Sequence, residues 1–257
     1  MQDYNTIRTA GTATRSAALD EGLRTYMNKV YSLMAVGMLV TAGAAWGISG
    51  LALSDVPTQW ALGNGHYLTE FGKTLYLSPL KWLVMFAPLV MVFAFGAAIN
   101  RLSVSAATTL FYAFAAVMGV SISWIFAAYT PFSIVQTFLV TAIAFAGLSL
   151  YGYTTKRDLS AMGTFLMMGV IGLIVASIVN IFLKSGAVQF AISAIGVLIF
   201  AGLTAFDTQN IKNTYLQLAN SDRDFLGKAA IMGALQLYLD FLNLFMFLLQ
   251  FMGNRNN

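Results

Sequence analysis

Two aspartates lie in long apolar stretches of the sequence, where an acidic side chain requires a physical reason. Asp207 ends the uncharged run that follows Lys184, and Asp240 lies near the middle of residues 229–252. An aspartate at the centre of a membrane helix costs about 2.5–3.5 kcal/mol on insertion scales, so Asp240 must face protein or water. The short connection over residues 212–228 predicts adjacent, antiparallel helices that bring the two carboxyl groups together. Asp207 has an alternative interpretation as an interfacial residue near its helix end.

Polar residues around Asp240 fall on one side of the helix expected there. At about 100° per residue they occupy an arc of about 100°, and the rest of the circumference is Leu, Phe, Met and Ile. The stripe consists of Gly233, Gln236, Asp240, Asn243 and Gln250. A helix of this kind buries its polar side against neighbouring helices, which suits a position inside a bundle.

Composition indicates that the helices carrying these aspartates cross a membrane. The chain of 257 residues is 58% hydrophobic and 9% charged, whereas soluble domains have about 45–50% apolar and about 25% charged residues. One span needs about 20 apolar residues, and the run between Arg101 and Lys156 fits two spans, separated at Pro131. The prediction is an all-α integral membrane protein with seven transmembrane helices, over residues 30–54, 82–100, 102–128, 132–153, 159–183, 185–206 and 229–252.

Basic residues favour an orientation with the N-terminus in the cytoplasm. In that orientation ten of them lie inside, namely Arg8, Arg15, Arg24, Lys29, Arg101, Lys156, Arg157, Lys212, Arg223 and Lys228. Four lie outside, namely Lys73, Lys81, Lys184 and Arg255. The inside excess is the usual bias of multi-pass proteins. Residues 1–28 are then a polar cytoplasmic tail, expected to be disordered or only partly helical, and residues 29–253 form the seven-helix transmembrane domain.

Composition also excludes several kinds of site. The chain has no cysteine and one histidine, His66, so thiolate chemistry is absent and a single imidazole cannot build a zinc site. The net charge of +4 reflects the basic bias, and no basic run with interleaved aromatics predicts nucleic-acid binding. We expect no cofactor.

Three segments resemble the signature sequences of the Bax inhibitor-1 family, bacterial branch. They are Gly-Leu-Thr-Ala-Phe-Asp-Thr-Gln at 202–209, Leu-Tyr-Leu-Asp-Phe-Leu-Asn-Leu-Phe at 237–245 and Leu-Tyr-Gly-Tyr-Thr-Thr-Lys-Arg-Asp-Leu-Ser at 150–160. The resemblance covers residues 22–255 and implies a bacterial inner-membrane protein with its last helix at the centre of the other six. It also implies a pH-sensitive Ca²⁺ leak, in which Asp207 and Asp240 share a proton and gate the pore.

The chemistry implied by this resemblance follows from carboxylates at close range. Two of them in a low-dielectric site cannot both ionise easily, so they titrate as a unit. Ca²⁺ takes 6–8 oxygen ligands. Asp207 and Asp240 would supply carboxylates for the passing ion, and Gln236, Asn243 and Thr204 would add amide or hydroxyl oxygens. An incomplete shell suits passage, because a conducted ion must also leave.

Arg101, at the end of the second expected span, has two interpretations. As a latch it would pair with Asp207 and hold a closed state. As an ordinary anchor it would contribute to the inside excess of basic residues.

Two other functions stay open beside the leak channel. One is a non-conducting regulator that binds other membrane proteins, such as membrane proteases. The other is an intramembrane aspartyl protease, which also uses two aspartates. Residues 237–239 before Asp240 are Leu-Tyr-Leu, however, where those proteases have Gly-x-Gly. We therefore expect a protein without enzymatic activity.

Overall fold

The computed structural model describes residues 3–63, 66–219 and 222–255. Its elements are α1 (Asp3–Ala52), β1 (Leu53–Ser54), β2 (Ala61–Gly63), β3 (His66–Leu68), α2 (Glu70–Tyr76), α3 (Leu80–Ala98), the 3₁₀ helix η1 (Ile99–Arg101), α4 (Val104–Ile122), α5 (Ile125–Ala128), α6 (Pro131–Thr154), α7 (Ser160–Leu183), α8 (Gly186–Leu218) and α9 (Arg223–Met252). Within the described residues, seven segments are long and apolar enough to cross a membrane: they lie in α1, α3, α4 with α5, α6, α7, α8 and α9. The predicted seven-span, all-α fold is confirmed.

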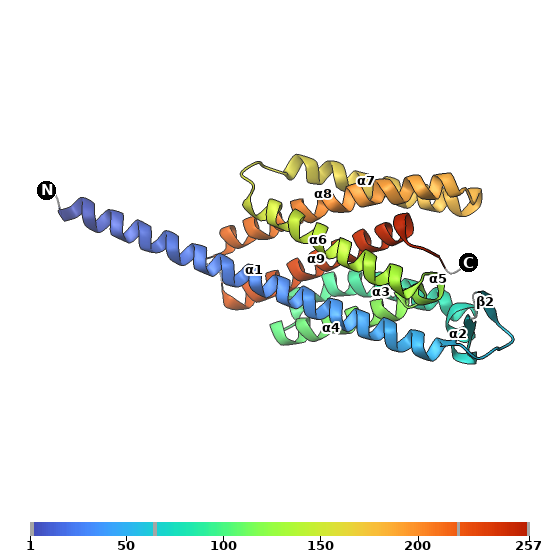
Figure 1. The fold of residues 1–257 in the computed structure, drawn as a ribbon. Coiled ribbons are helices and arrows are strands. Elements are labelled where there is room, and N and C mark those ends of the chain that lie inside the picture. The colour runs from blue at the N-terminus through green and yellow to red at the C-terminus, as the bar shows by residue number, and fades with distance from the viewer. Residues whose placement is uncertain (1–2, 64–65, 220–221, 256–257) are drawn as a thin grey trace.

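The spans alternate in direction, so their connections gather at two ends of the bundle (Figure 1). We call one end the basic end; it holds the α3–α4, α6–α7 and α8–α9 connections, and α1 enters the bundle there. The basic residues near it are Arg24, Lys29, Arg101, Lys156, Arg157, Lys212, Arg223 and Lys228. The opposite end, the strand end, holds the three strands, α2 and the C-terminal residues. Assignment of the basic end to the cytoplasm stays a prediction from the charge bias.

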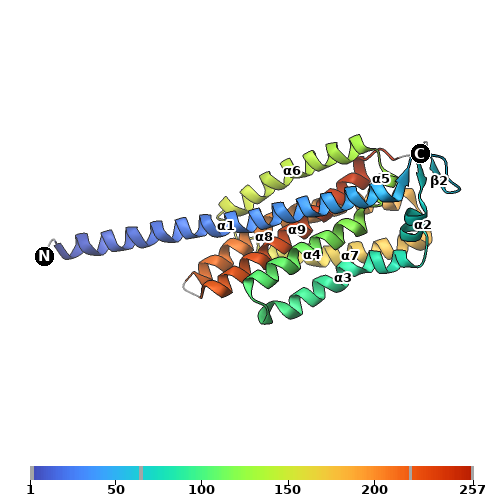
Figure 2. The ribbon, with the colours of Figure 1, turned by 90° about the horizontal axis from the view of Figure 1, so that it is seen from below.

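α1 is one continuous helix of 50 residues, and its N-terminal part extends beyond the bundle (Figures 1 and 2). The expectation that residues 1–28 are disordered or partly helical is wrong from Asp3 onward; Met1 and Gln2 lie outside the described residues. The segment is rich in Ala, Arg and Thr and contains no proline. The helix of the first span therefore meets no residue that would end it.

α9 occupies the middle of the bundle, in contact with α1, α4, α6 and α8 (Figure 2). In its most apolar stretch 67% of residues are buried, against 33% or less in the six other spans of the described chain. The polar stripe explains this position, because a helix with amide and carboxyl groups along one side is costly in lipid. The expected central placement of the last helix is confirmed.

The helices that carry the aspartates both extend beyond their apolar segments. α8 continues eleven residues past Asp207, to Leu218, so the placement of Asp207 near a helix end is wrong. α9 begins at Arg223, six residues before the apolar stretch that starts at Ala229. Charged residues mark the edge of the lipid rather than the end of the helix. Both carboxyl groups consequently lie well inside regular helix.

The strand end is closed by a small sheet for which the sequence analysis predicts no element. Its strand order is β1-β3-β2, with both pairings antiparallel. The Thr69 hydroxyl accepts from Gly72 N at the start of α2 and donates to the Leu51 carbonyl 2.8 Å away, which attaches this cap to α1. The Tyr76 hydroxyl lies 2.8 Å from Ser123 Oγ, and burial of Tyr76 raises the pKa of its phenol. The predicted break at Pro131 is confirmed, with Thr130 as the N-cap of α6.

Candidate functional site: a buried carboxyl pair

Asp207 on α8 and Asp240 on α9 form a buried carboxyl pair, as the two sequence segments predict. Each residue is 5% exposed. Their side chains are in hydrogen-bonding contact with each other, and Asp207 also bonds the Gln236 side chain. A hydrogen bond between two carboxyl groups requires a proton on one of them. The contact is therefore the arrangement in which two carboxyl groups can share one proton.

The pair is poorly supplied with donors. Asp240 Oδ2 is the buried side-chain polar atom that has no hydrogen-bond partner within the described chain. In the same residues no Lys or Arg forms an ion pair with either carboxylate. An unpaired buried oxygen carries the full desolvation cost of that group, about 1–3 kcal/mol and more for a charged one. This arrangement is unfavourable for stability, so a structural role alone does not account for it.

The three predicted supporting residues differ in whether they contact the carboxyl pair. Gln236 bonds Asp207, as stated above. Thr204 lies one turn before Asp207, fully buried, and donates its hydroxyl to the Phe200 carbonyl at 2.8 Å, which leaves the hydroxyl oxygen able to accept. Asn243 donates from Nδ2 to the Leu239 carbonyl at 2.8 Å. Gln236 is therefore the supporting residue that the structure brings to the pair.

Arg101 does not reach the pair in this structure. It ends η1 at the basic end with an exposed side chain, and in the part of the chain that the structure describes no ion pair joins it to Asp207. The position suits the interpretation as an anchor at the membrane surface. The latch stays a prediction.

Two polar residues that follow Asp207 fix α8 to α6 and to the α6–α7 connection, and the sequence analysis missed both. Thr208 Oγ1 lies 3.2 Å from Ser149 Oγ on α6. Gln209 Oε1 accepts from Leu159 N at 2.9 Å, and Gln209 Nε2 donates to the Arg157 carbonyl at 2.7 Å. Both lie in the Asp-Thr-Gln segment, so polar residues adjacent to Asp207 were the available signal. They hold the Asp207 segment of α8 in place.

Asp158, an exposed residue of the α6–α7 connection, accepts hydrogen bonds from the first residue of α7. Its Oδ1 accepts from Ser160 N at 2.9 Å and from Ser160 Oγ at 2.6 Å, just where α7 begins. These two hydrogen bonds from Ser160 hold the pKa of the Asp158 carboxyl below its usual value.

Near Asp240, Tyr238 attaches α9 to two neighbouring helices. Its hydroxyl lies 2.6 Å from Thr41 Oγ1 on α1, and Thr41 also donates to the Ala115 carbonyl on α4 at 2.8 Å. Tyr238 is fully buried, with Phe111 and Phe114 edge-on to its ring. Neither Tyr238 nor Thr41 was predicted to have a role at the site, since a tyrosine among leucines is typical of an ordinary core. Together these bonds fix the position of the Asp240 segment of α9 along the bundle axis.

A second polar cluster, which we call the amide bridge, links α7, α8 and α9 toward the strand end. Asn180 Nδ2 donates to Gln189 Oε1 at 3.2 Å, and Gln189 Nε2 donates to Gln250 Oε1 at 2.8 Å. Asn180 Oδ1 also accepts from Ser185 N at 3.1 Å. Gln250 is the last residue of the polar stripe. The stripe therefore contributes Gln236 and Asp240 to the carboxyl pair and Gln250 to the amide bridge.

These features define a multi-pass helical membrane protein whose central helix and one of its neighbours carry a buried acidic pair. The family model described as inhibitor of apoptosis-promoting Bax1 matches residues 23–257. The chain belongs to this Bax inhibitor-1 family.

Bacterial relatives match almost the whole chain. The inner membrane protein YbhL of Escherichia coli K12 is 45% identical over 234 residues, which cover 91% of this chain and 93% of YbhL. An uncharacterised protein of Caulobacter vibrioides is 44% identical over 98% of both chains. One of Rickettsia prowazekii is 42% identical over the full length of both. The membrane spans and these relatives identify a multi-pass protein of the bacterial inner membrane.

Proposed function

We propose that this protein is a pH-sensitive cation leak channel that passes Ca²⁺ across the inner membrane. Protonation of the carboxyl pair on α8 and α9 gates it. The proposal assigns no catalytic role to the pair and no bound cofactor to the protein. The observation that carries it is the contact between Asp207 and Asp240, both buried inside the bundle. Among the described residues, no Lys or Arg forms an ion pair with either carboxylate.

The gate follows from the charge of the pair. With one shared proton the pair carries a single negative charge, and its hydrogen bond keeps α8 and α9 together. When that proton leaves, two carboxylates about 4 Å apart repel by about 4 kcal/mol at an effective dielectric constant of about 20. That energy favours separation of Asp207 and Asp240 or entry of a cation between them. We therefore expect the closed state at low pH and the conducting state at higher pH.

The oxygen ligands suit a passing ion. Two carboxylates with the Gln236 amide oxygen and the Thr204 hydroxyl fall short of the 6–8 oxygens that Ca²⁺ takes, so water must complete the shell. A site of this kind binds weakly, as conduction requires. The positive-inside bias supports a direction in which the basic end, with the N-terminus of α1, faces the cytoplasm.

The test is Ca²⁺ flux into liposomes that contain the purified full chain, recorded between about pH 5 and about pH 8. Wild-type flux is expected to change at least about tenfold, since about 1.4 kcal/mol corresponds to a factor of ten. Asp207→Asn and Asp240→Asn should each abolish that pH response. Asp222→Asn is the matched control, because it removes one exposed carboxylate at the start of α9 and should respond like the wild type.

The same variants separate the alternatives. A leak that is absent, or that ignores both substitutions, contradicts the proposal. Cleavage of a transmembrane peptide that is lost in Asp207→Asn and Asp240→Asn would favour the aspartyl protease. If flux and cleavage are both absent and a membrane protein co-purifies, the non-conducting regulator is supported instead.

A further inference from the structure

The helices α1 and α6 lie beside each other with hardly any direct contact, and they leave a seam along the bundle (Figure 2). α1 packs on α4 and α9, and α6 packs on α8 and α9. A Cβ atom added to Gly152 on α6 would collide with the Ala205 carbonyl on α8, which shows how closely α6 is held. The seam is therefore open to the lipid between two helices that are each fixed elsewhere.

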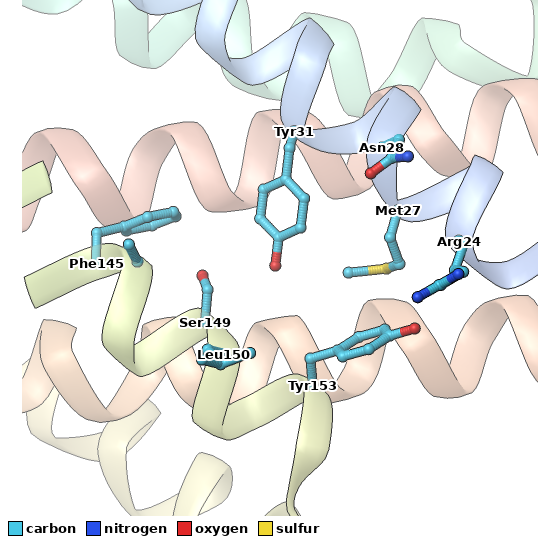
Figure 3. A pocket seen from close by; sticks show the side chains of 9 residues that line it. Arg24, Met27, Asn28, Tyr31, Phe145, Ser149, Leu150 and Tyr153 are labelled. Carbon is cyan, nitrogen blue, oxygen red and sulfur yellow. The ribbon is translucent and has the colours of Figure 1, made fainter. Parts of the chain in front are cut away.

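Two hollows lie on this seam. The one toward the basic end, the polar hollow, has a volume of about 450 Å³ and a mixed lining. Arg24, Asn28 and Tyr31 from α1 face Ser149 and Tyr153 from α6, and the apolar part of the lining comes from Met27, Phe145, Ala146 and Leu150. Figure 3 shows the Tyr31 hydroxyl pointing across the hollow toward Ser149. The second hollow measures about 300 Å³ and is lined by apolar side chains and Thr41, with Ala42, Phe138 and Leu242 among them. The seam thus has charged and polar side chains at the basic end and an apolar hollow further along the bundle.

The two hollows match the depth of one lipid leaflet. Arg24 lies before the uncharged run that begins at Val30, so it stands at the level of the headgroups. Half of a bilayer core is about 15 Å, which corresponds to about ten residues of helix. Ten residues from Tyr31 is Thr41, in the lining of the apolar hollow. An acyl chain that starts beside Tyr31 would end there.

The polar hollow carries one lining cation, Arg24. Lys212 on α8 is not part of the lining, but it donates from Nζ to the carbonyl of the lining residue Tyr153 at 2.7 Å and lies 5.7 Å from the centre of that ring. No acidic residue lines the hollow, and across the described residues neither cation is in an ion pair. Arginine and lysine placed at headgroup depth are the groups that recognise lipid phosphate.

We propose that the α1–α6 seam binds one acidic phospholipid of the leaflet at the basic end. Its phosphate pairs with Arg24 in the polar hollow, and an acyl chain follows the seam from Tyr31 to the apolar hollow. This site uses none of the residues of the carboxyl pair, and its existence does not require that the protein conducts ions. A free phosphate would use the polar hollow alone, whereas a phospholipid uses both hollows, so both must contribute to binding.

The headgroup half of the site is tested by native mass spectrometry of the full chain in micelles with equimolar phosphatidylglycerol and phosphatidylethanolamine. Wild-type protein is expected to retain one phosphatidylglycerol. Arg24→Gln should lower that retention at least about fivefold, because a charge-assisted hydrogen bond to phosphate is lost. Arg157→Gln removes the same charge from the same end, off the seam, and should retain the lipid as the wild type does.

The acyl half is tested with two neighbouring substitutions on α1. Ala42→Phe places a ring in the apolar hollow and should displace the lipid, whereas Gly43→Phe should not, because a Cβ at Gly43 meets no atom within 4 Å. Wild-type elution and melting establish that each variant folds. Equal retention of both lipids, equal behaviour of Arg24→Gln and Arg157→Gln, or equal behaviour of the two Phe variants overturns the proposal. A lipid-free dimer seated on the seam would do so too.

Discussion

The carboxyl pair and the amide bridge are both polar contacts that join α8 to α9 within the bundle, but they use different chemical groups. The amide bridge uses neutral groups that donate and accept in sequence, Asn180 to Gln189 to Gln250. The carboxyl pair uses two acids and leaves Asp240 Oδ2 without a partner. Amides hold helices together at any pH, while the acids do so when they share a proton. Under the proposed function, this difference gives the contact between α8 and α9 a dependence on pH that the amide bridge lacks.

The two clusters also differ in whether basic residues lie near them. Lys184 and Arg255 line the hollow beside Gln189 and Gln250, so a negative charge there would have cations near it. The described residues place no such ion pair on the carboxyl pair. Adding one carboxylate to each cluster from the same helix therefore tests the comparison directly.

The largest effect is expected from Gln236→Glu, which adds a third carboxyl group in contact with Asp207. At about pH 8 the variant should melt several degrees below the wild type, because a chain of this size loses about 2–4 °C per kcal/mol. The measurement is thermal melting in detergent. Gln250→Glu makes the same change fourteen residues further along α9 and should melt within about a degree of the wild type at every pH. Equal losses in both variants would contradict the comparison.

A smaller effect of opposite sign is expected when the pair is made neutral. The double variant Asp207→Asn with Asp240→Asn removes the repulsion that opposes folding when both acids ionise. It should melt about 2–4 °C above the wild type at about pH 8, and this advantage should disappear as the pH falls and the pair takes up its proton. Melting curves across pH measure both quantities. A wild-type melting temperature that is flat across pH would show that the pair does not titrate in this range.

The smallest effect is expected at Asp158, whose carboxyl pKa lies below its ordinary value of 3.8 because Ser160 donates two hydrogen bonds to it. A lowered pKa in the folded protein stabilises it above the unfolded value, and the stabilisation is lost as the pH falls through the folded value. Asp158→Asn should therefore melt slightly below the wild type at about pH 6, with the gap closing toward about pH 3. A gap that widens on acidification would show the opposite sign.

The sequence predicts the membrane part of this fold well because charges are excluded from lipid. The uncharged runs located all seven spans, and the polar stripe placed α9 inside. The helix ends were predicted less well. Residues 208–218 are mostly polar and include Lys212, yet α8 passes through them, because its inner side packs in the bundle through Thr208, Gln209, Ile211 and Tyr215. The helix of α1 also begins earlier than expected, at Asp3 instead of near the first span.

The residues of the candidate site also divide into those that the sequence predicts and those that it does not. Asp207 and Asp240 are visible in the sequence because each is an acid within an apolar stretch. Gln209 and Thr41 act through partners far along the chain, at Leu159 and Tyr238, so their roles depend on which helices become neighbours. The α1–α6 seam is harder still to predict, since it is defined by two helices that avoid direct contact.

That seam has a consequence for how the two halves of the molecule influence each other. Its walls are both fixed to α8: Tyr26 of α1 packs on Tyr215 with ring centres 5.0 Å apart, and Lys212 bonds the end of α6. In the proposed gate, movement of α8 when Asp207 gains or loses a proton would therefore change the width of the seam. Thermodynamic linkage makes this relation reciprocal, so any molecule that prefers one width must alter the proton affinity of the carboxyl pair. If the carboxyl pair is the gate proposed above, the composition of the surrounding membrane becomes an allosteric input to it.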